Sequence, residues 1–200
     1  MLIHRSIISS SPLLLKPISL PPNPKPLKPK TLTISSSFSF SSTKPSLSIS
    51  DSDLLSRGFV LHSSASSLNL DDLNTVFVRV GFPRRDPAKI RKALDHTPSL
   101  LWIEHAKTRK PVAFARATGD GVFNAIIWDV VVDPSYQGFG LGKAVMERLI
   151  RELLDRGISN IALYAEPKVL GFYRPLGFSA DPDGIRGMVY SMKQQQRKRN

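Results

Sequence analysis

A glycine-rich connection between a strand and a helix constrains this chain more than any other feature. The segment 130–144 reads VVVDPSYQGFGLGKA, in which three valines lead into Asp-Pro and glycine stands at positions 138, 140 and 142. Backbone N–H groups at the start of a helix have no partner within the helix, and the helix dipole adds positive potential there. Glycine lets a ligand approach that backbone closely. The segment therefore predicts an anion-binding site, typically one for phosphate.

Two familiar phosphate-binding patterns do not fit this segment. A Walker loop needs G-x-x-x-x-G-K-[ST], but Ala144 follows Gly142-Lys143, and Gln137 stands where the first glycine is required. A dinucleotide fingerprint needs G-x-G-x-x-G, and its third glycine position is occupied by Lys143. The sequence therefore excludes these two classes of nucleotide site.

The flanking residues predict a mixed α/β domain. Apolar periodicity and turn signals indicate strands at 58–63, 99–106, 112–118, 123–132, 160–165 and 187–192. They indicate helices at 69–80, from 86 onward, at 141–156 and at 167–176. The three middle strands are joined by short turns and are expected to be antiparallel, whereas the later strands are separated by helices and can run parallel to a neighbour.

The first fifty residues have the composition of an organelle address. They hold six Lys/Arg, no Asp or Glu, fourteen Ser and eight Pro, so they are expected to be disordered. A single arginine, Arg5, and many prolines favour a plastid over a mitochondrial address, and Lys16 and Pro17 cut the leucine run that a secretory signal would need. A disordered tail without an address is the alternative. The predicted organisation is a leader at 1–55, one domain at 56–192 and a basic disordered tail at 193–200, with processing around 50–65.

Charge and cysteine content exclude several function classes. The net charge of +12 comes mostly from the two ends, because residues 51–192 hold eighteen Lys/Arg against sixteen acids. Nucleic-acid binding is therefore not expected, and the tail KQQQRKRN is either a solvated basic end or a contact patch. The absence of cysteine excludes disulfides, thiolate metal sites and a cysteine acyl-enzyme. The four histidines lack metal-ligand spacing, so no metal is expected, and no apolar run is long enough for a membrane helix.

A pattern that does fit the glycine segment is [RQ]-x-x-G-x-[GA], read as QGFGLG at 137–142 after a strand that ends in V-x-P. Together with a second motif, GFYRPLGF at 171–178, it resembles the GCN5-related N-acetyltransferases, and the resemblance covers roughly residues 58–192. The segments at 77–90, 114–134 and 177–188 resemble the plant plastid branch. The resemblance implies a mostly antiparallel mixed sheet with helices on both faces and acetyl-CoA as co-substrate.

The resemblance also implies the cofactor-binding residues. The glycine loop would hold the diphosphate of acetyl-CoA, and the strand before it would hold the thioester arm through its backbone. The residues assigned to this role are Val130, Val131, Val132, Gln137, Gly138, Phe139, Gly140, Leu141, Gly142 and Lys143. Gln137 replaces the arginine that is commoner in the family, and Lys143 either restores a charge or is a solvated lysine.

Two side chains are assigned to the chemistry. Tyr173, in the second motif, is expected to protonate the departing thiolate, since a phenol and a thiol have similar pKa values; packing in the core is its alternative role. Asp129 is a candidate general base on the central strand, where alternation places it on the face opposite Trp128; its alternative role is to hold a loop. Glu166 is a further candidate base. With no cysteine, we expect direct transfer in a ternary complex.

Three functions remain open from the sequence. The first is a plastid acetyltransferase that modifies protein lysines, protein N-termini or both, as members of the plastid branch are associated with doing. The second is a small-amine acetyltransferase that acts on serotonin or a similar arylalkylamine. The third is a non-catalytic interaction protein on the same fold.

Overall fold

The structure is a computed structural model and describes residues 46–180 of the 200-residue chain. Five strands form one sheet in chain order, and the expected last strand at 187–192 lies outside the described residues. The strands are β1 (Phe59–His62), β2 (Ser99–His105), β3 (Lys110–Gly119), β4 (Asn124–Val132) and β5 (Asn160–Leu163). The pairs β1–β2, β2–β3 and β3–β4 are antiparallel, and β5 runs parallel to β4. The predicted mixed, mostly antiparallel sheet is confirmed.

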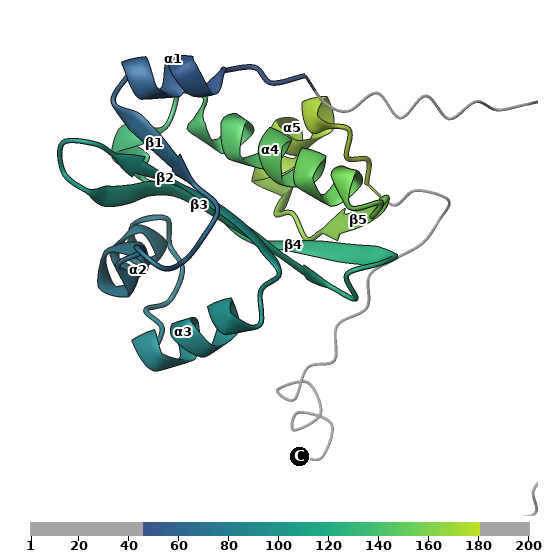
Figure 1. Ribbon diagram of the computed structural model, residues 1–200, viewed down its shortest axis with the longest axis horizontal. Coiled ribbons are helices and arrows are strands. Elements are labelled where there is room, and N and C mark those ends of the chain that lie inside the picture. The colour runs from purple at the N-terminus through teal and green to yellow at the C-terminus, as the bar shows by residue number, and fades with distance from the viewer. Residues whose placement is uncertain (1–45, 181–200) are drawn as a thin grey trace, which may run out of the picture. The chain divides into compact units, whose positions relative to one another are not determined.

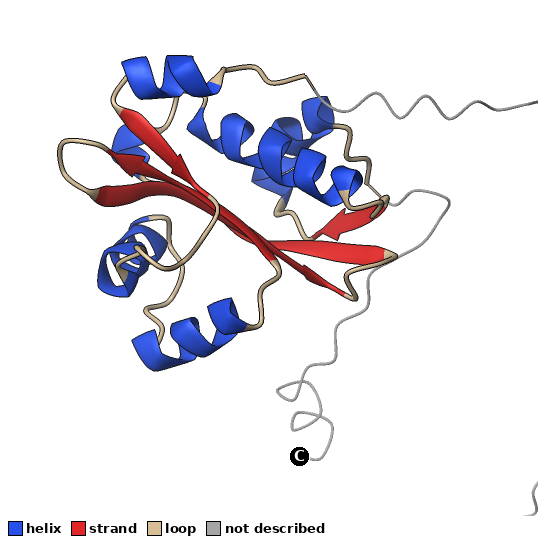
Figure 2. Ribbon diagram, viewed as in Figure 1, coloured by secondary structure: helices blue, strands red, loops and turns tan. Residues whose placement is uncertain are grey.

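Helices cover both faces of this sheet (Figures 1 and 2). One face carries α1 (Asp51–Ser56), α4 (Leu141–Asp155) and α5 (Leu170–Tyr173), and the other carries α2 (Leu70–Arg79) and α3 (Pro87–Asp95). Short 3₁₀ turns lie at η1 (Pro134–Tyr136), η2 (Pro167–Val169) and η3 (Arg174–Leu176). Within the described part of the chain, no helix is long and apolar enough to cross a membrane.

Local chemistry accounts for the helix boundaries. The Asn69 side chain accepts hydrogen bonds from two backbone N–H groups at the start of α2, and Asp86 caps α3 with Pro87 in the first turn. The helix expected at 167–176 is instead split into η2, α5 and η3. Pro175 explains the break, because proline lacks the backbone N–H that a continuous helix would use.

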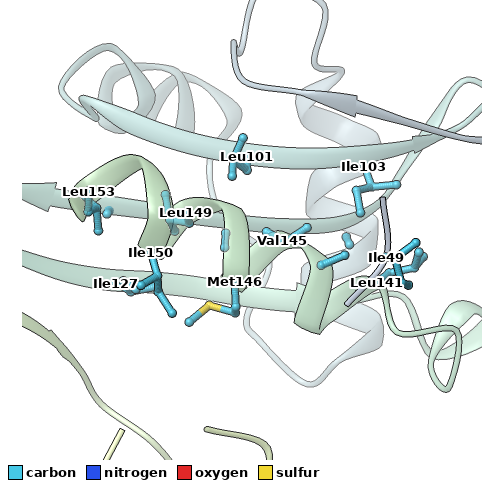
Figure 3. Close-up of a cluster of buried hydrophobic side chains, with 14 of the residues drawn as sticks. Ile49, Leu101, Ile103, Ile127, Leu141, Val145, Met146, Leu149, Ile150 and Leu153 are labelled. Carbon is cyan, nitrogen blue, oxygen red and sulfur yellow. The ribbon is translucent and has the colours of Figure 1, made fainter. Parts of the chain in front are cut away.

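Two apolar clusters fill the space above and below the sheet. On β2, Leu101 and Ile103 point to α4, while Leu100 and Trp102 point to α2 and α3, as strand alternation requires. Figure 3 shows the first cluster, in which α4 lays one side along β2, β3 and β4. Leu149 and Met146 of that helix are fully buried. The predicted amphipathic stripe of α4 therefore forms the centre of the larger core.

The folded part begins earlier than the predicted boundary at residue 56. Ser50 caps α1 through its hydroxyl, which accepts from the backbone N–H of Asp53, and Leu54 is only 1% exposed. Ile49 is also buried in the α4 cluster. The Ser/Pro-rich composition extends up to these residues, and it obscures the few apolar side chains that anchor the segment 46–55.

Candidate active site

The centre of the site is a place where β4 and β5 separate. Their parallel ladder runs from the pair Asn124–Asn160 to the pair Ile127–Leu163 and ends there. Beyond Ile127, β4 continues for five more residues, paired only with β3 on its other side. Within residues 46–180, the backbone of Val130, Val131 and Val132 that faces β5 therefore has no strand partner, as the family resemblance implies for the thioester-binding strand.

A β-bulge at Asp129 re-aims this part of β4. Arg116 pairs with Trp128 and Phe114 pairs with Val131, so two residues of β4 stand opposite a single residue of β3. Asp129 has a φ of 53°, a left-handed conformation that is uncommon for a residue other than glycine. Bulges bend a strand and redirect side chains, and they often lie beside active sites.

A cleft of about 510 Å³ lies on one side of the separated strands. The three valines and the glycine loop line it, together with side chains from η1, η2 and α5. The lining residues are Val130, Val131, Val132, Tyr136, Gln137, Gly138, Gly140, Leu141, Gly142, Lys143, Val169, Phe172 and Tyr173. Every residue predicted to bind the cofactor therefore lines this cleft except Phe139. The Phe139 ring is 52% exposed and contacts Phe59 of β1, with 6.3 Å between ring centroids.

The three glycines of the loop have different neighbours. Gly138 and Gly140 have φ values of 85° and 80°, which other residues rarely adopt. A Cβ on Gly140 would lie 2.9 Å from the Ile49 side chain, away from the cleft. A Cβ on Gly142 would instead lie 3.1 Å from Val132 and 3.4 Å from Phe172, both of which line the cleft. Gly142 is therefore the glycine whose missing side chain keeps the cleft open.

The loop also provides the cation of Lys143 and a side-chain hydrogen bond from Gln137 to the preceding strand. Lys143 lines the cleft, and its Nζ lies 3.7 Å from Oε1 of Glu147 one turn later in α4. Gln137, in the position that is arginine in many family members, donates from Nε2 to the Val132 carbonyl at 3.2 Å. The side chain of Gln137 therefore ties the loop to the strand.

A second cleft, of about 710 Å³, lies where β4 and β5 meet the α2–α3 connection. The two clefts share Val130 to Val132, Gln137, Val169 and Tyr173. Tyr173 is 9% exposed at this junction, and burial raises the pKa of its phenol above the ordinary value of 10.0. A molecule in either cleft can therefore reach the same tyrosine.

Asp129 is enclosed by two arginines from different elements. Its Oδ2 accepts from Arg116 Nε at 2.7 Å and from Arg85 Nη1 at 3.0 Å, and its Oδ1 accepts from Arg85 Nη2 at 2.9 Å. Burial alone would raise the pKa of Asp129, but the hydrogen bonds and positive charges of these arginines outweigh it, so the pKa lies below 3.8. Asp129 is therefore a firmly ionised carboxylate that joins β3, β4 and the α2–α3 connection.

The expected alternation of Trp128 and Asp129 is wrong. Trp128 donates from Nε1 to Thr118 at 2.8 Å, and Asp129 bonds Arg116, so both side chains lie on the face that carries α2 and α3. The bulge is the physical reason, because it places two successive residues against one residue of β3.

The sequence analysis did not identify the arginines that form ion pairs around the site. Arg85 and Arg116 were not among the candidates, although a lone arginine within the apolar strand FARAT was a visible signal. A second ion pair joins Arg79 of α2 to Asp133, with 2.5 Å between Nη1 and Oδ2, and Asp133 also caps η1. Glu166 lines the second cleft at its exposed edge, where its carboxylate pairs with Lys168 at 2.7 Å. Among the residues that the structure describes, no cluster of ligands could hold a metal ion.

Comparisons with known proteins agree with this geometry. The chain is 71% identical over 154 residues to the Arabidopsis thaliana protein "GCN5-related N-acetyltransferase 1, chloroplastic", covering 77% of this chain and 78% of that one. It is 57% identical over 149 residues to the rice protein "Serotonin N-acetyltransferase 2, chloroplastic", covering 73% and 74%. These names confirm the expected chloroplast location.

A crystal structure of a probable acetyltransferase from Staphylococcus aureus shares the fold, with a TM-score of 0.58 at 18% identity, over 66% of this chain and 98% of that one. The profile described as the acetyltransferase (GNAT) family matches residues 68–178. The chain therefore belongs to the GNAT family of acetyl-CoA-dependent acetyltransferases.

Proposed function

We propose that the protein acetylates amines of chloroplast proteins, on lysine side chains, on N-termini or on both, by direct transfer from acetyl-CoA in a ternary complex. The observation that carries this proposal is the meeting of two clefts at Val130 to Val132 and Tyr173. A thioester enters from the glycine loop, and an amine enters from the other side. The second cleft has an exposed edge at Tyr164 and Glu166, so it could admit an amine that is attached to a protein chain.

The glycine loop and β4 would hold the donor. Leu141, Gly142 and Lys143 of the first turn of α4 line the cleft, and their backbone N–H groups, which have no partner within the helix, would suit the diphosphate, with the helix dipole and the Lys143 ammonium adding positive potential. The backbone groups of Val130 to Val132 that lack a partner in β5 would bind the thioester arm, although the Val132 carbonyl already accepts from Gln137, and an N–H there would stabilise negative charge on the acetyl oxygen. Leu141 is 1% exposed, so it contributes backbone while its side chain packs in the core.

The transfer makes one bond and breaks another. The neutral amine nitrogen attacks the thioester carbon, a C–N bond forms, and the C–S bond breaks to leave a thiolate. Tyr173 would donate its phenolic proton to that thiolate, and the proton that the acylated nitrogen releases would pass through water to the Tyr173 phenolate and restore the phenol. Because burial raises the pKa of Tyr173, the phenol stays protonated at the neutral to mildly alkaline pH of catalysis. The uphill transfer from an ordinary phenol of pKa about 10 to a thiol of pKa about 8.5 costs about 2 kcal/mol. The raised pKa of Tyr173 makes this cost larger.

We assign Asp129 a positioning role in place of the general base that the sequence indicated. An ammonium of pKa about 10.4 and a carboxylate of pKa below 3.8 differ by more than about six units, or roughly 9 kcal/mol for the proton transfer. Glu166 is the other carboxylate that lines the second cleft, the proposed acceptor cleft, and it lies at the solvent-exposed edge. The amine would therefore lose its proton to water at that exposed edge, beside Glu166.

A specific observation supports a second acceptor class, the arylalkylamines. Trp128 and Tyr164 line the acceptor cleft with ring centroids 5.7 Å apart, and Tyr164 is 59% exposed. An exposed aromatic pair provides a stacking surface for an indole ring. The name of the rice relative also refers to serotonin.

Separate assays with a peptide acceptor and with serotonin test both proposals. The full-length protein would be assayed with acetyl-CoA and either a lysine-containing peptide with a free N-terminus or serotonin. We expect Trp128→Ala to lower kcat/KM for serotonin about tenfold, the loss of one aromatic contact, and to change the value for the peptide less than about twofold. No acetylated peptide by mass spectrometry, with rapid serotonin turnover, would overturn the protein-acceptor proposal. Equal losses for both acceptors would overturn the aromatic surface.

A further inference from the structure

A short segment ahead of the domain lies across the start of α4. Residues 48–51, here called the strap, precede and begin α1, and Ile49 packs beside Leu141 in the α4 cluster (Figure 3). The strap contacts side chains that are 97 to 99 residues away in the sequence. These contacts fall on the first two turns of α4, which follow directly from the glycine loop.

The strongest contact is a buried arginine. Arg148 is 8% exposed, and its Nε donates to Asp51 Oδ1 at 2.9 Å. The same guanidinium donates to the Ile49 carbonyl at 2.8 Å and to the Ala144 carbonyl at 3.0 Å, and it forms a second bond to Asp51. A buried cation needs such partners, because removing its counter-charge leaves an uncompensated charge. The Arg148 guanidinium therefore forms hydrogen bonds both to the strap and to the first turn of α4.

A second contact controls the carboxylate next to Lys143. The backbone N–H and the hydroxyl of Ser48 both donate to Glu147 Oε2 at 2.8 Å. Glu147 is 3% exposed, and its other oxygen lies 3.7 Å from Lys143 Nζ, longer than a hydrogen bond. With Glu147 held by Ser48, the Lys143 ammonium keeps hydrogen-bonding capacity for an anion in the cleft.

The third contact is steric. Ile49 Cδ1 lies 2.9 Å from the position a Cβ would take on Gly140, so the isoleucine packs directly on the backbone of the glycine loop. Gly140 has a left-handed φ and caps α4 without a side-chain hydrogen bond. A packed neighbour therefore holds a loop that has no side-chain cap of its own.

We infer that the strap positions the diphosphate loop for acetyl-CoA, and that leader processing accordingly cuts N-terminal to Ser48. This inference rests on the placement of the diphosphate proposed above. It differs from the range of 50–65 expected from composition, because a cut within that range would remove part or all of the strap. A chain that begins after Asp51 would leave Arg148 and Glu147 without these partners.

Import of the full-length precursor into isolated chloroplasts tests the processing limit. The N-terminus of the imported protein would be read by mass spectrometry. We expect it at Ser48 or at an earlier residue. A mature protein that begins after Asp51 and is active would overturn the inference.

Point variants in the full-length chain test the positioning role. Asp51→Ala removes the partner of Arg148, and Asp53→Ala makes the same chemical change in the same first turn of α1, where the carboxylate of Asp53 bonds only Ser50 among the contacts described. We expect Asp51→Ala to raise the KM for acetyl-CoA about fivefold with kcat changed less than about twofold, and Asp51→Glu to restore most of the affinity. Asp53→Ala should leave KM unchanged.

The outcomes separate this inference from the proposed function. An unchanged KM in Asp51→Ala, or equal changes in the Asp51 and Asp53 variants, would overturn the strap's role. Gly142→Asp serves as the reference for the cofactor site, since its side chain would enter the cleft. If Gly142→Asp keeps full affinity, the diphosphate placement fails. If only Gly142→Asp loses affinity, the placement stands and the strap inference fails.

Discussion

Replacing Asp129 by asparagine distinguishes a general base from a positioning residue. The substitution keeps the size of the side chain but removes the charge that Arg85 and Arg116 surround. The carboxylate accepts three hydrogen bonds from these arginines, and an asparagine has one oxygen to offer while its NH₂ faces a donor. The change therefore loses at least one charged hydrogen bond and leaves Arg116, whose side chain is 17% exposed, partly unpaired.

The magnitude follows from these contacts. A charged hydrogen bond contributes about 1.5–3 kcal/mol, and breaking a buried ion pair costs about 3–5 kcal/mol. Arg85 is 37% exposed and recovers some hydration, so we take about 3 kcal/mol for Asp129→Asn. For a domain of this size that free energy corresponds to a fall in Tm of about 10 °C, measurable by thermal unfolding.

The pH dependence of this loss is fixed by the direction of the pKa shift. The pKa of Asp129 is lower in the folded protein than in the unfolded chain, so its contribution is complete above about pH 4 and disappears as the pH falls through the folded value. The stability gap between wild type and Asp129→Asn should therefore be constant from pH 5 to 8 and shrink below pH 4. A gap that grows on acidification would contradict the assigned ion pairs.

Kinetics complete the test. We expect kcat/KM of Asp129→Asn to be lower but to keep the pH profile of the wild type between pH 5 and 9, because no group that titrates in that range has been removed. Loss of a pH-dependent step, with Tm within about 1 °C of the wild type, would show that Asp129 is the base and refute the positioning role.

Three further outcomes follow from the site and the core. Tyr173→Phe should lower kcat by about 10²-fold and leave acetyl-CoA affinity within about twofold, as steady-state kinetics and calorimetry would show; equal kcat would remove the phenol from the reaction. Because its pKa is raised, Tyr173 should not cause a fall in kcat below about pH 10, and a fall at pH 8–9 that is absent in Tyr173→Phe would contradict this. Leu149→Ala, at a fully buried position of α4, should cost about 3 kcal/mol in denaturant unfolding, and a loss under about 1 kcal/mol would refute the packing described for that helix.

The sequence predicts the elements around the site more reliably than the contacts between them. The glycine loop, the long strand before it and the amphipathic α4 are local patterns, so periodicity and turn chemistry locate them within a residue or two. The Arg85–Asp129–Arg116 cluster joins three elements, and no local pattern encodes which charges meet. The bulge at Asp129 is equally non-local, since it depends on the register with β3.

The strap shows that composition alone does not predict where the leader ends and the folded domain begins. Residues 46–55 continue the serine-rich character of the leader, yet Ser48, Ile49 and Asp51 each contact α4. Only their partners in α4, Glu147 and Arg148, identify these residues as part of the domain, because their serine-rich composition matches that of the leader. Arg148 was the available signal, because it falls three residues after Val145 and seven after Leu141 on the apolar stripe of α4, whereas Glu147 lies on the side that periodicity assigns as polar.

Calorimetric titration of the full-length protein with acetyl-CoA, with Gly142→Asp as the comparison, is the decisive test of the placement of the diphosphate on the glycine loop. We expect saturable one-site binding to the wild type and a loss of at least about 100-fold in Gly142→Asp, because the new carboxylate would enter the cleft beside Val132 and oppose the diphosphate. Equal affinity of a folded Gly142→Asp protein would show that the diphosphate lies elsewhere.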